Sequence, residues 1–159
     1  MKKIIKISII LFSVSLLFTS CSNDDETSCP ESGSTLILNG EKLIFQNVGY
    51  GIDLEDNGYR LQLDLYRDEG DSHGEQAIQV QLRFKKTGEN IIEKIIFRRE
   101  GNGNLIYSQL TKPQIQSKVT INRNTCFKGS FSSTFTSGDQ QVSITDADIN
   151  FVYYNPLGE

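Results

Sequence analysis

Hydrophobic and polar residues alternate along most of the chain after residue 34. In residues 59–66, leucines at every second position share one face and polar side chains share the other, and residues 77–85 and 127–135 repeat the pattern. Because successive side chains of a β-strand point to opposite faces, a period of two predicts strands with one face in a core. We therefore expect an all-β domain over residues 34–159.

Glycine-containing turns separate these runs. Asn39-Gly40 and residues 56–58 are sequences that tolerate positive φ in tight hairpins, and residues 137–139 form a similar turn. About nine short strands with such turns are typical of a single antiparallel β-sandwich or barrel. Residues 91–99 also fit one face of a helix, but their β-branched residues favour a strand.

The apolar phase of the alternating runs predicts which side chains fill the core. The expected core residues are Leu36, Leu61, Leu63, Leu65, Ile78, Val80, Leu82, Phe84, Phe131, Phe135, Ile144 and Phe151.

The first 20 residues form a different kind of segment. Lysines at the start precede the apolar residues 7–18, and the small residues Thr19 and Ser20 follow. This order is typical of a secretory signal peptide. The alternative is a transmembrane helix, which needs about 20 apolar residues, whereas serines interrupt this run.

The sequence Leu-Phe-Thr-Ser-Cys that ends at Cys21 resembles the lipobox of bacterial lipoproteins, with Phe18 where an aliphatic residue is more common. The resemblance implies cleavage before Cys21 and acylation of its thiol. Residues 21–33 then form the lipidated cysteine and a flexible acidic tether. Two acyl chains are enough for stable anchoring in a membrane, so the folded domain need not contact lipid.

The residues after Cys21 resemble the acidic export tag of surface lipoproteins of Bacteroidota. These residues are Ser22, Asn23, Asp24, Asp25 and Glu26. The resemblance implies an outer membrane lipoprotein exposed at the cell surface. If the stretch is only a solvated spacer, the protein faces the periplasm instead.

Both ends of the domain resemble small uncharacterised Bacteroidota lipoproteins. The similar segments are residues 38–43 near the start and residues 128–132 with 142–145 near the end. The chain departs from that pattern at Ala147, where glycine is expected, and at Ile149, where an aromatic residue is expected. The resemblance implies a β-sandwich and no particular activity.

Cysteine and charge content restrict the surroundings of the domain. With Cys21 acylated, Cys29 and Cys126 remain as an even pair in an exported protein, which predicts a disulfide rather than two free thiols. The chain has a net charge of -4, and removal of residues 1–20 makes it more negative because three lysines are lost. Nucleic acid and anionic membrane surfaces are therefore poor partners, and membrane contact is expected only through the lipid anchor.

The residues that carry chemistry do not form a recognisable catalytic or cofactor site. The one histidine, His73, lies in an acidic loop, and no G-x-S-x-G motif or zinc ligand set is present. We expect no catalytic residue and no cofactor. Asp68, Asp71 and Glu75 are a weak candidate for calcium, since their spacing does not follow the EF-hand pattern, and a solvated loop is the alternative.

These observations favour a lipid-anchored cell-envelope protein that acts as a non-catalytic binding or accessory module for a glycan or a protein. An aromatic platform is one possible surface for such a ligand, although tyrosines in strands more often pack against the core. The candidate platform residues are Tyr50, Tyr59, Tyr66, Tyr107, Tyr153 and Tyr154. The alternatives are a small hydrolase that uses two carboxylates and a purely structural envelope component.

Overall fold

The computed structural model describes residues 28–68, 74–101 and 104–158. The elements in chain order are β1 (Gly33–Leu38), β2 (Glu41–Glu55), β3 (Gly58–Asp68), β4 (Glu75–Arg83), β5 (Gly88–Glu89), β6 (Ile92–Gly101), β7 (Asn104–Thr111), the 3-10 helix η1 (Lys112–Gln114), β8 (Gln116–Asn122), β9 (Cys126–Ser137) and β10 (Gln140–Val152).

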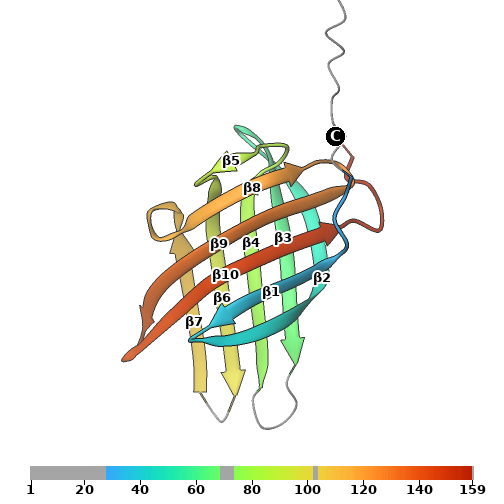
Figure 1. Ribbon diagram of the computed structural model, residues 1–159. Helices are drawn as coiled ribbons and strands as arrows, with labels where there is room; N and C mark the ends of the chain where they lie inside the picture. The colour runs from blue at the N-terminus through green and yellow to red at the C-terminus, as the bar shows by residue number, and fades with distance from the viewer. Residues whose placement is uncertain (1–27, 69–73, 102–103, 159) are drawn as a thin grey trace, which may run out of the picture.

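The strands form one curled antiparallel sheet in the order β5-β8-β9-β10-β1-β2-β3-β4-β6-β7. Figure 1 shows how the sheet folds into two layers, with β8, β9, β10 and β1 in front and β3, β4, β6 and β7 behind. The expected all-β fold is confirmed. The described residues contain ten strands rather than about nine, because the two-residue β5 pairs with the edge of β8.

The long strand β2 joins the two layers. Its first part pairs with β1 and its second part pairs with β3, and a bulge lies between Asn47 and Gly49. A bulge bends a strand and increases its twist, so β2 can pass from one layer to the other. The Asn47 side chain fastens this bend, because its Oδ1 accepts a hydrogen bond from Ser34 Oγ at 2.7 Å and its Nδ2 donates to the Asn150 carbonyl at 2.7 Å.

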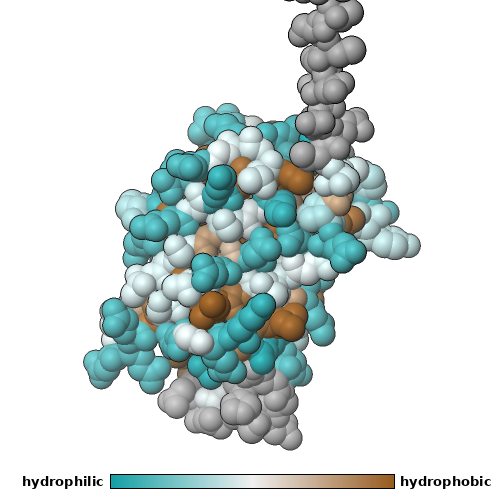
Figure 2. Space-filling model, in the orientation of Figure 1, coloured by the Kyte–Doolittle hydropathy of each residue, from teal (hydrophilic) through white to brown (hydrophobic). Residues whose placement is uncertain are grey.

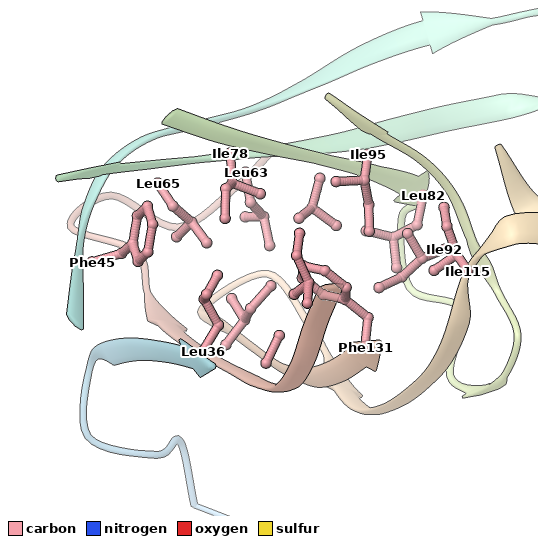
Figure 3. Packing of buried hydrophobic residues seen from close by; sticks show 14 of the residues in the cluster. Leu36, Phe45, Leu63, Leu65, Ile78, Leu82, Ile92, Ile95, Ile115 and Phe131 are labelled. Atoms are coloured by element: carbon pink, nitrogen blue, oxygen red, sulfur yellow. The ribbon is translucent and has the colours of Figure 1, made fainter. Parts of the chain in front are cut away.

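The core fills the space between the layers, as Figure 3 shows. All twelve side chains expected in the core are buried. Residues 92–101 form the strand β6, so the preference for a strand over a helix in this region is confirmed. Ile92, Ile95 and Phe97 from this strand are fully buried, and Ala147 and Ile149 of β10 are core residues as well.

One end of the sandwich is closed by a disulfide. Cys29 and Cys126 are bonded, with their Cα atoms 5.8 Å apart, so the expected bridge is confirmed. It links the chain just before β1 to the first residue of β9. The first described residues and the C-terminus lie together at this end of the molecule (Figure 1).

The C-terminal segment after β10 covers the same end. The amide of Tyr153 donates to the Thr125 carbonyl at 3.0 Å, and the amide of Leu157 donates to the Asn124 carbonyl at 2.7 Å. The Leu157 side chain is buried against the core. The segment therefore belongs to the folded domain, and it packs beside the residue that carries the disulfide.

Candidate functional site

A hollow of about 300 Å³ lies on the outer face of the back layer, on the side of the sheet opposite the core. We call it the outer-face hollow. Its walls include the side chains of Asp64, Tyr66, Gln79, Ile96, Arg98 and Tyr107. These residues come from β3, β4, β6 and β7, and each occupies the outward phase of its strand. The regular alternation that fills the core therefore also places these side chains on one surface.

Two tyrosines stand on either side of the hollow because of strand register. Ala77 on β4 lies opposite Tyr66 on β3 and opposite Arg98 on β6, and Arg98 lies opposite Tyr107 on β7. Directly opposed residues have Cβ atoms about 5 Å apart. Ala77 projects only a methyl group, so the sheet beside Tyr66 stays open and apolar, while the Arg98 side chain stands between Ala77 and Tyr107. Tyr107 is 55% exposed, so its ring is accessible to a ligand.

A ladder of amide side chains fixes the carboxylate at one side of the hollow. Gln79 Nε2 donates to Asp64 Oδ1 at 2.8 Å, and Gln62 Nε2 donates to Asp64 Oδ2 at 3.3 Å. Gln81 Nε2 in turn donates to Gln79 Oε1 at 2.8 Å. Because an ionised carboxylate has about four lone-pair sites, Asp64 can still accept a hydrogen bond from a ligand.

Gly49 on β2 leaves space for this carboxylate. It lies opposite Asp64 in the strand register. A Cβ atom at Gly49 would be 2.9 Å from Asp64 Oδ2, which is closer than such atoms normally approach. Any larger residue at this position would displace the carboxylate or push the strands apart.

The hollow lies in a negatively charged part of the sheet. Asp68, Glu75 and Glu100 are neighbours in the next row of the register, at the ends of β3, β4 and β6. Arg98 forms an ion pair with Glu100. Burial raises the pKa of the Tyr66 phenol, and the negative charges of Glu75 and Asp68 and a hydrogen bond to Glu75 raise it further.

The weak calcium candidate is only partly described by the structure. Asp68 lies opposite Glu75, whereas Asp71 and also His73 lie outside the described residues. Within the described ranges, no group of three His, Cys, Asp or Glu side chains is arranged to hold a metal ion.

The six tyrosines do not form one platform. Tyr66 and Tyr107 line opposite sides of the outer-face hollow, whereas Tyr50 and Tyr153 stack near the C-terminal end with ring centroids 4.7 Å apart. Tyr59 is half-buried against the core, and Tyr154 is 92% exposed. Sequence reasoning identified the two tyrosines of the hollow but missed its other members. These residues could have been found from the outward-facing positions of the alternating runs, where Ala77 is a small residue among larger ones.

A second and more polar depression of about 450 Å³ lies on the outer face of β8 and β9. Its lining includes Glu89, Gln116, Lys118, Ser130, Ser132 and Asp146. Figure 2 shows the molecule from the side of this layer, and its surface is mostly hydrophilic. Phe131 is the only aromatic residue among those that line the depression, and its side chain is buried in the core. The outer-face hollow therefore offers the better surface for stacking and apolar contact.

The proposed lipidation residue Cys21 and the acidic residues 22–26 lie outside the described residues. The described part of the chain has no helix with the length and apolar character needed to cross a membrane. Comparisons with protein-family models, curated proteins and solved structures find no match to this chain.

Proposed function

We propose that this protein is a lipid-anchored component of the cell envelope that binds a glycan or a protein without catalysis and holds this ligand in the outer-face hollow. The observation that carries the proposal is the placement of Tyr66 and Tyr107 at the two ends of a row that contains Ala77 and Arg98, next to a carboxylate fixed by amides. Apolar and aromatic walls with a few fixed polar groups are the usual composition of a ligand site.

The position of the hollow supports display at a membrane surface. The row of Tyr66, Ala77, Arg98 and Tyr107 is near the end where β3 ends and β4 begins. The first described residues lie at the opposite end of the domain (Figure 1). A chain anchored through Cys21 would therefore present the hollow away from the membrane. The resemblance to a lipobox supports the anchor. The resemblance of residues 22–26 to an acidic export tag supports export to the outer face.

A small carboxylate-dependent hydrolase and a purely structural envelope component are the alternative functions. Glycoside hydrolysis requires two carboxyl groups about 5–10 Å apart on either side of the scissile bond. Asp64 and Glu75 are the acids to test for such a role, because Asp64 lines the hollow and Glu75 lies on the same face, opposite Asp68 at the end of β3.

The experiment is a ligand screen with the full chain in neutral detergent. Glycan arrays and affinity purification from envelope extracts would be run with the native protein, Tyr107→Ala and the control Tyr154→Ala. Both substitutions remove an exposed tyrosine ring, but only Tyr107 lies in the hollow. We expect Tyr107→Ala to lose about tenfold in affinity for any ligand found, since loss of aromatic stacking costs on the order of 1 kcal/mol and apolar contact is lost as well.

The outcomes separate the three functions. A ligand whose binding is equally affected by both tyrosine substitutions would remove the hollow from the proposal. Release of product from a bound polysaccharide or peptide, abolished by Asp64→Asn or Glu75→Gln, would establish the hydrolase instead.

A further inference from the structure

Most of the charged side chains around the outer-face hollow are negative. Asp64 lines the hollow, and Asp68, Glu75 and Glu100 form the adjacent row. Among the described residues that line the hollow, Arg98 is the only cation, and Glu100 already pairs with it.

The other nearby cations do not reverse this bias. Arg67 and Arg99 lie opposite the buried Gln76 in the register, so they occupy the inward phase of β3 and β6. Lys94 lies on the outward phase of β6 in the row next to that of Asp64, so it and Arg98 are two cations against the four carboxylates of this face. The outward-facing charges around the hollow are therefore mostly negative.

The walls of the hollow also suit a cation. The face of an aromatic ring carries negative charge density and attracts ammonium and guanidinium groups. Tyr66 and Tyr107 supply two such rings, while Ala77 and Ile96 supply apolar surface for an aliphatic stem. Asp64 can accept the hydrogen bonds of the charged group. The raised pKa of Tyr66 is consistent with negative charges close to its phenol.

The strand beside the hollow favours a polypeptide over a sugar. β7 is the last strand of the sheet, and residues 104–111 contain no charged side chain. Uncharged edge strands accept the backbone of an extended segment, because charged residues and proline are what normally block such pairing. Leu105 is 61% exposed and Tyr107 is 55% exposed on this strand. A neutral sugar, in contrast, would gain nothing from the excess of negative charge on this face.

We infer that the outer-face hollow binds the side chain of a lysine or arginine that a protein partner presents on an extended segment beside β7. This inference rests on the proposed binding function and names its ligand. The alkyl stem lies on Ala77 and Ile96 beside the Tyr66 ring, Tyr107 borders the site beyond Arg98, and the cationic group approaches Asp64.

The test uses the full chain in neutral detergent and fluorescently labelled eight-residue peptides of alternating threonine and valine. One peptide carries a central lysine, a second carries arginine, a third carries Nε-acetyl-lysine and a fourth carries glutamate. Cellohexaose is the neutral glycan probe. We expect the lysine and arginine peptides to bind at least about tenfold more tightly than the acetylated peptide, and to weaken as salt is raised.

Matched variants locate the binding. Asp64→Asn and Tyr107→Ala should each weaken the lysine peptide about fivefold or more. Asp148→Asn is the control, because Asp148 is an exposed carboxylate on the other layer that also accepts an amide hydrogen bond. Circular dichroism of each variant checks that the fold is retained.

Two outcomes would overturn the inference and leave the proposed function intact. Equal affinity for the lysine and acetyl-lysine peptides would remove the requirement for a cation. Binding of cellohexaose with loss in Tyr107→Ala, and no binding of the peptides, would assign the hollow to a glycan. If no probe binds and Tyr107→Ala also behaves as Tyr154→Ala in the ligand screen, both the inference and the proposed site are wrong.

Discussion

The phenol of Tyr50 on β2 is hydrogen bonded to both backbone groups of Asn155. Tyr50 Oη accepts from the Asn155 amide at 2.7 Å and donates to the Asn155 carbonyl at 3.2 Å. These two contacts, more than 100 residues apart in sequence, hold the C-terminal segment on the end of the sandwich.

Tyr50→Phe should therefore destabilise the domain. The substitution keeps the ring that packs on Phe151 and Tyr153 but removes both hydrogen bonds. We expect a loss of about 1–2 kcal/mol in the free energy of unfolding, measured by urea titration. Tyr154→Phe removes an exposed hydroxyl and should change nothing. Equal stability of the two variants would show that the C-terminal segment is not held by Tyr50.

Tyr153→Phe, in contrast, should not lower the free energy of unfolding. The Tyr153 hydroxyl is buried and has no hydrogen-bond partner among the described residues. Burial raises the pKa of this phenol far above 10, and the neighbouring Tyr50 raises it further. Removal of an unsatisfied hydroxyl should be neutral or stabilising near pH 7.

Ionisation of Tyr153 should also make the stability of the domain depend on pH. The phenol ionises near pH 10 in the unfolded chain and only at higher pH in the folded chain. Ionisation of this group therefore leaves the free energy of unfolding unchanged below about pH 10 and lowers it as pH rises further. Urea titrations between pH 8 and 11 should show a smaller alkaline loss for Tyr153→Phe than for the native chain. Parallel curves for the two proteins would contradict this assignment.

Gly49→Ala should impair ligand binding more than folding. The added methyl group displaces the Asp64 carboxylate, which is the flexible end of a side chain, so we expect a destabilisation of about 1 kcal/mol or less. Binding of the lysine peptide should fall as far as it does in Asp64→Asn. Gly51→Ala is the control, because Gly51 lies on the same strand and a Cβ there meets no atom within 4 Å. Unchanged binding in Gly49→Ala would show that the carboxylate position does not matter.

The disulfide should contribute strongly to stability. Cys29 and Cys126 are 97 residues apart, and the chain-entropy model assigns about 4–5 kcal/mol to a loop of that size. The double variant Cys29→Ser with Cys126→Ser should therefore unfold at a much lower urea concentration. Intact mass of the native, non-reduced chain should be two hydrogens below the dithiol value. Two alkylatable thiols in the folded protein would contradict the bridge.

The proposed anchor makes a prediction about localisation. Cys21→Ser should give an unprocessed precursor, while the domain folds normally because no core residue is changed. Replacing Asp24, Asp25 and Glu26 with alanine should preserve lipidation but remove accessibility to external protease in whole cells. If protease accessibility is unchanged, the acidic stretch is only a spacer and not an export tag. Unchanged processing and membrane fractionation of Cys21→Ser would mean that residues 7–18 anchor the chain themselves.

The sequence predicted the core well because a period of two decides which face each residue occupies. Leu61, Leu63 and Leu65 all point inward, as their alternation required. The ambiguity of residues 91–99 also has a structural cause. Ile92 and Ile95 are three residues apart yet both buried, because the pairing of β4 with β6 shifts between Gln81 and Leu82. A register shift thus produces a helix-like spacing within a strand.

The alternation of hydrophobic and polar residues could not predict how the two layers are connected or where the candidate site lies. Glycines interrupt the stretch of residues 48–54, and the sequence did not reveal that β2 continues through a bulge into the second layer. The hollow depends on which residues of four strands lie opposite one another. Ala77 leaves the sheet open there only because its neighbours are Tyr66 and Arg98, and alternation within one strand contains no information about that register.

The Cys29–Cys126 bond also determines how mechanical load would enter the domain. A pull on the chain from its N-terminal side reaches Cys29 before it reaches β1. Part of that force passes through the bond into β9, which is hydrogen bonded along its length to β8 and β10. Without the bond, β1 would be the first strand to be peeled away from its neighbours. A force applied from the N-terminal side would therefore be shared between β1 and β9, and the sheet would resist it better than a sheet without the bond.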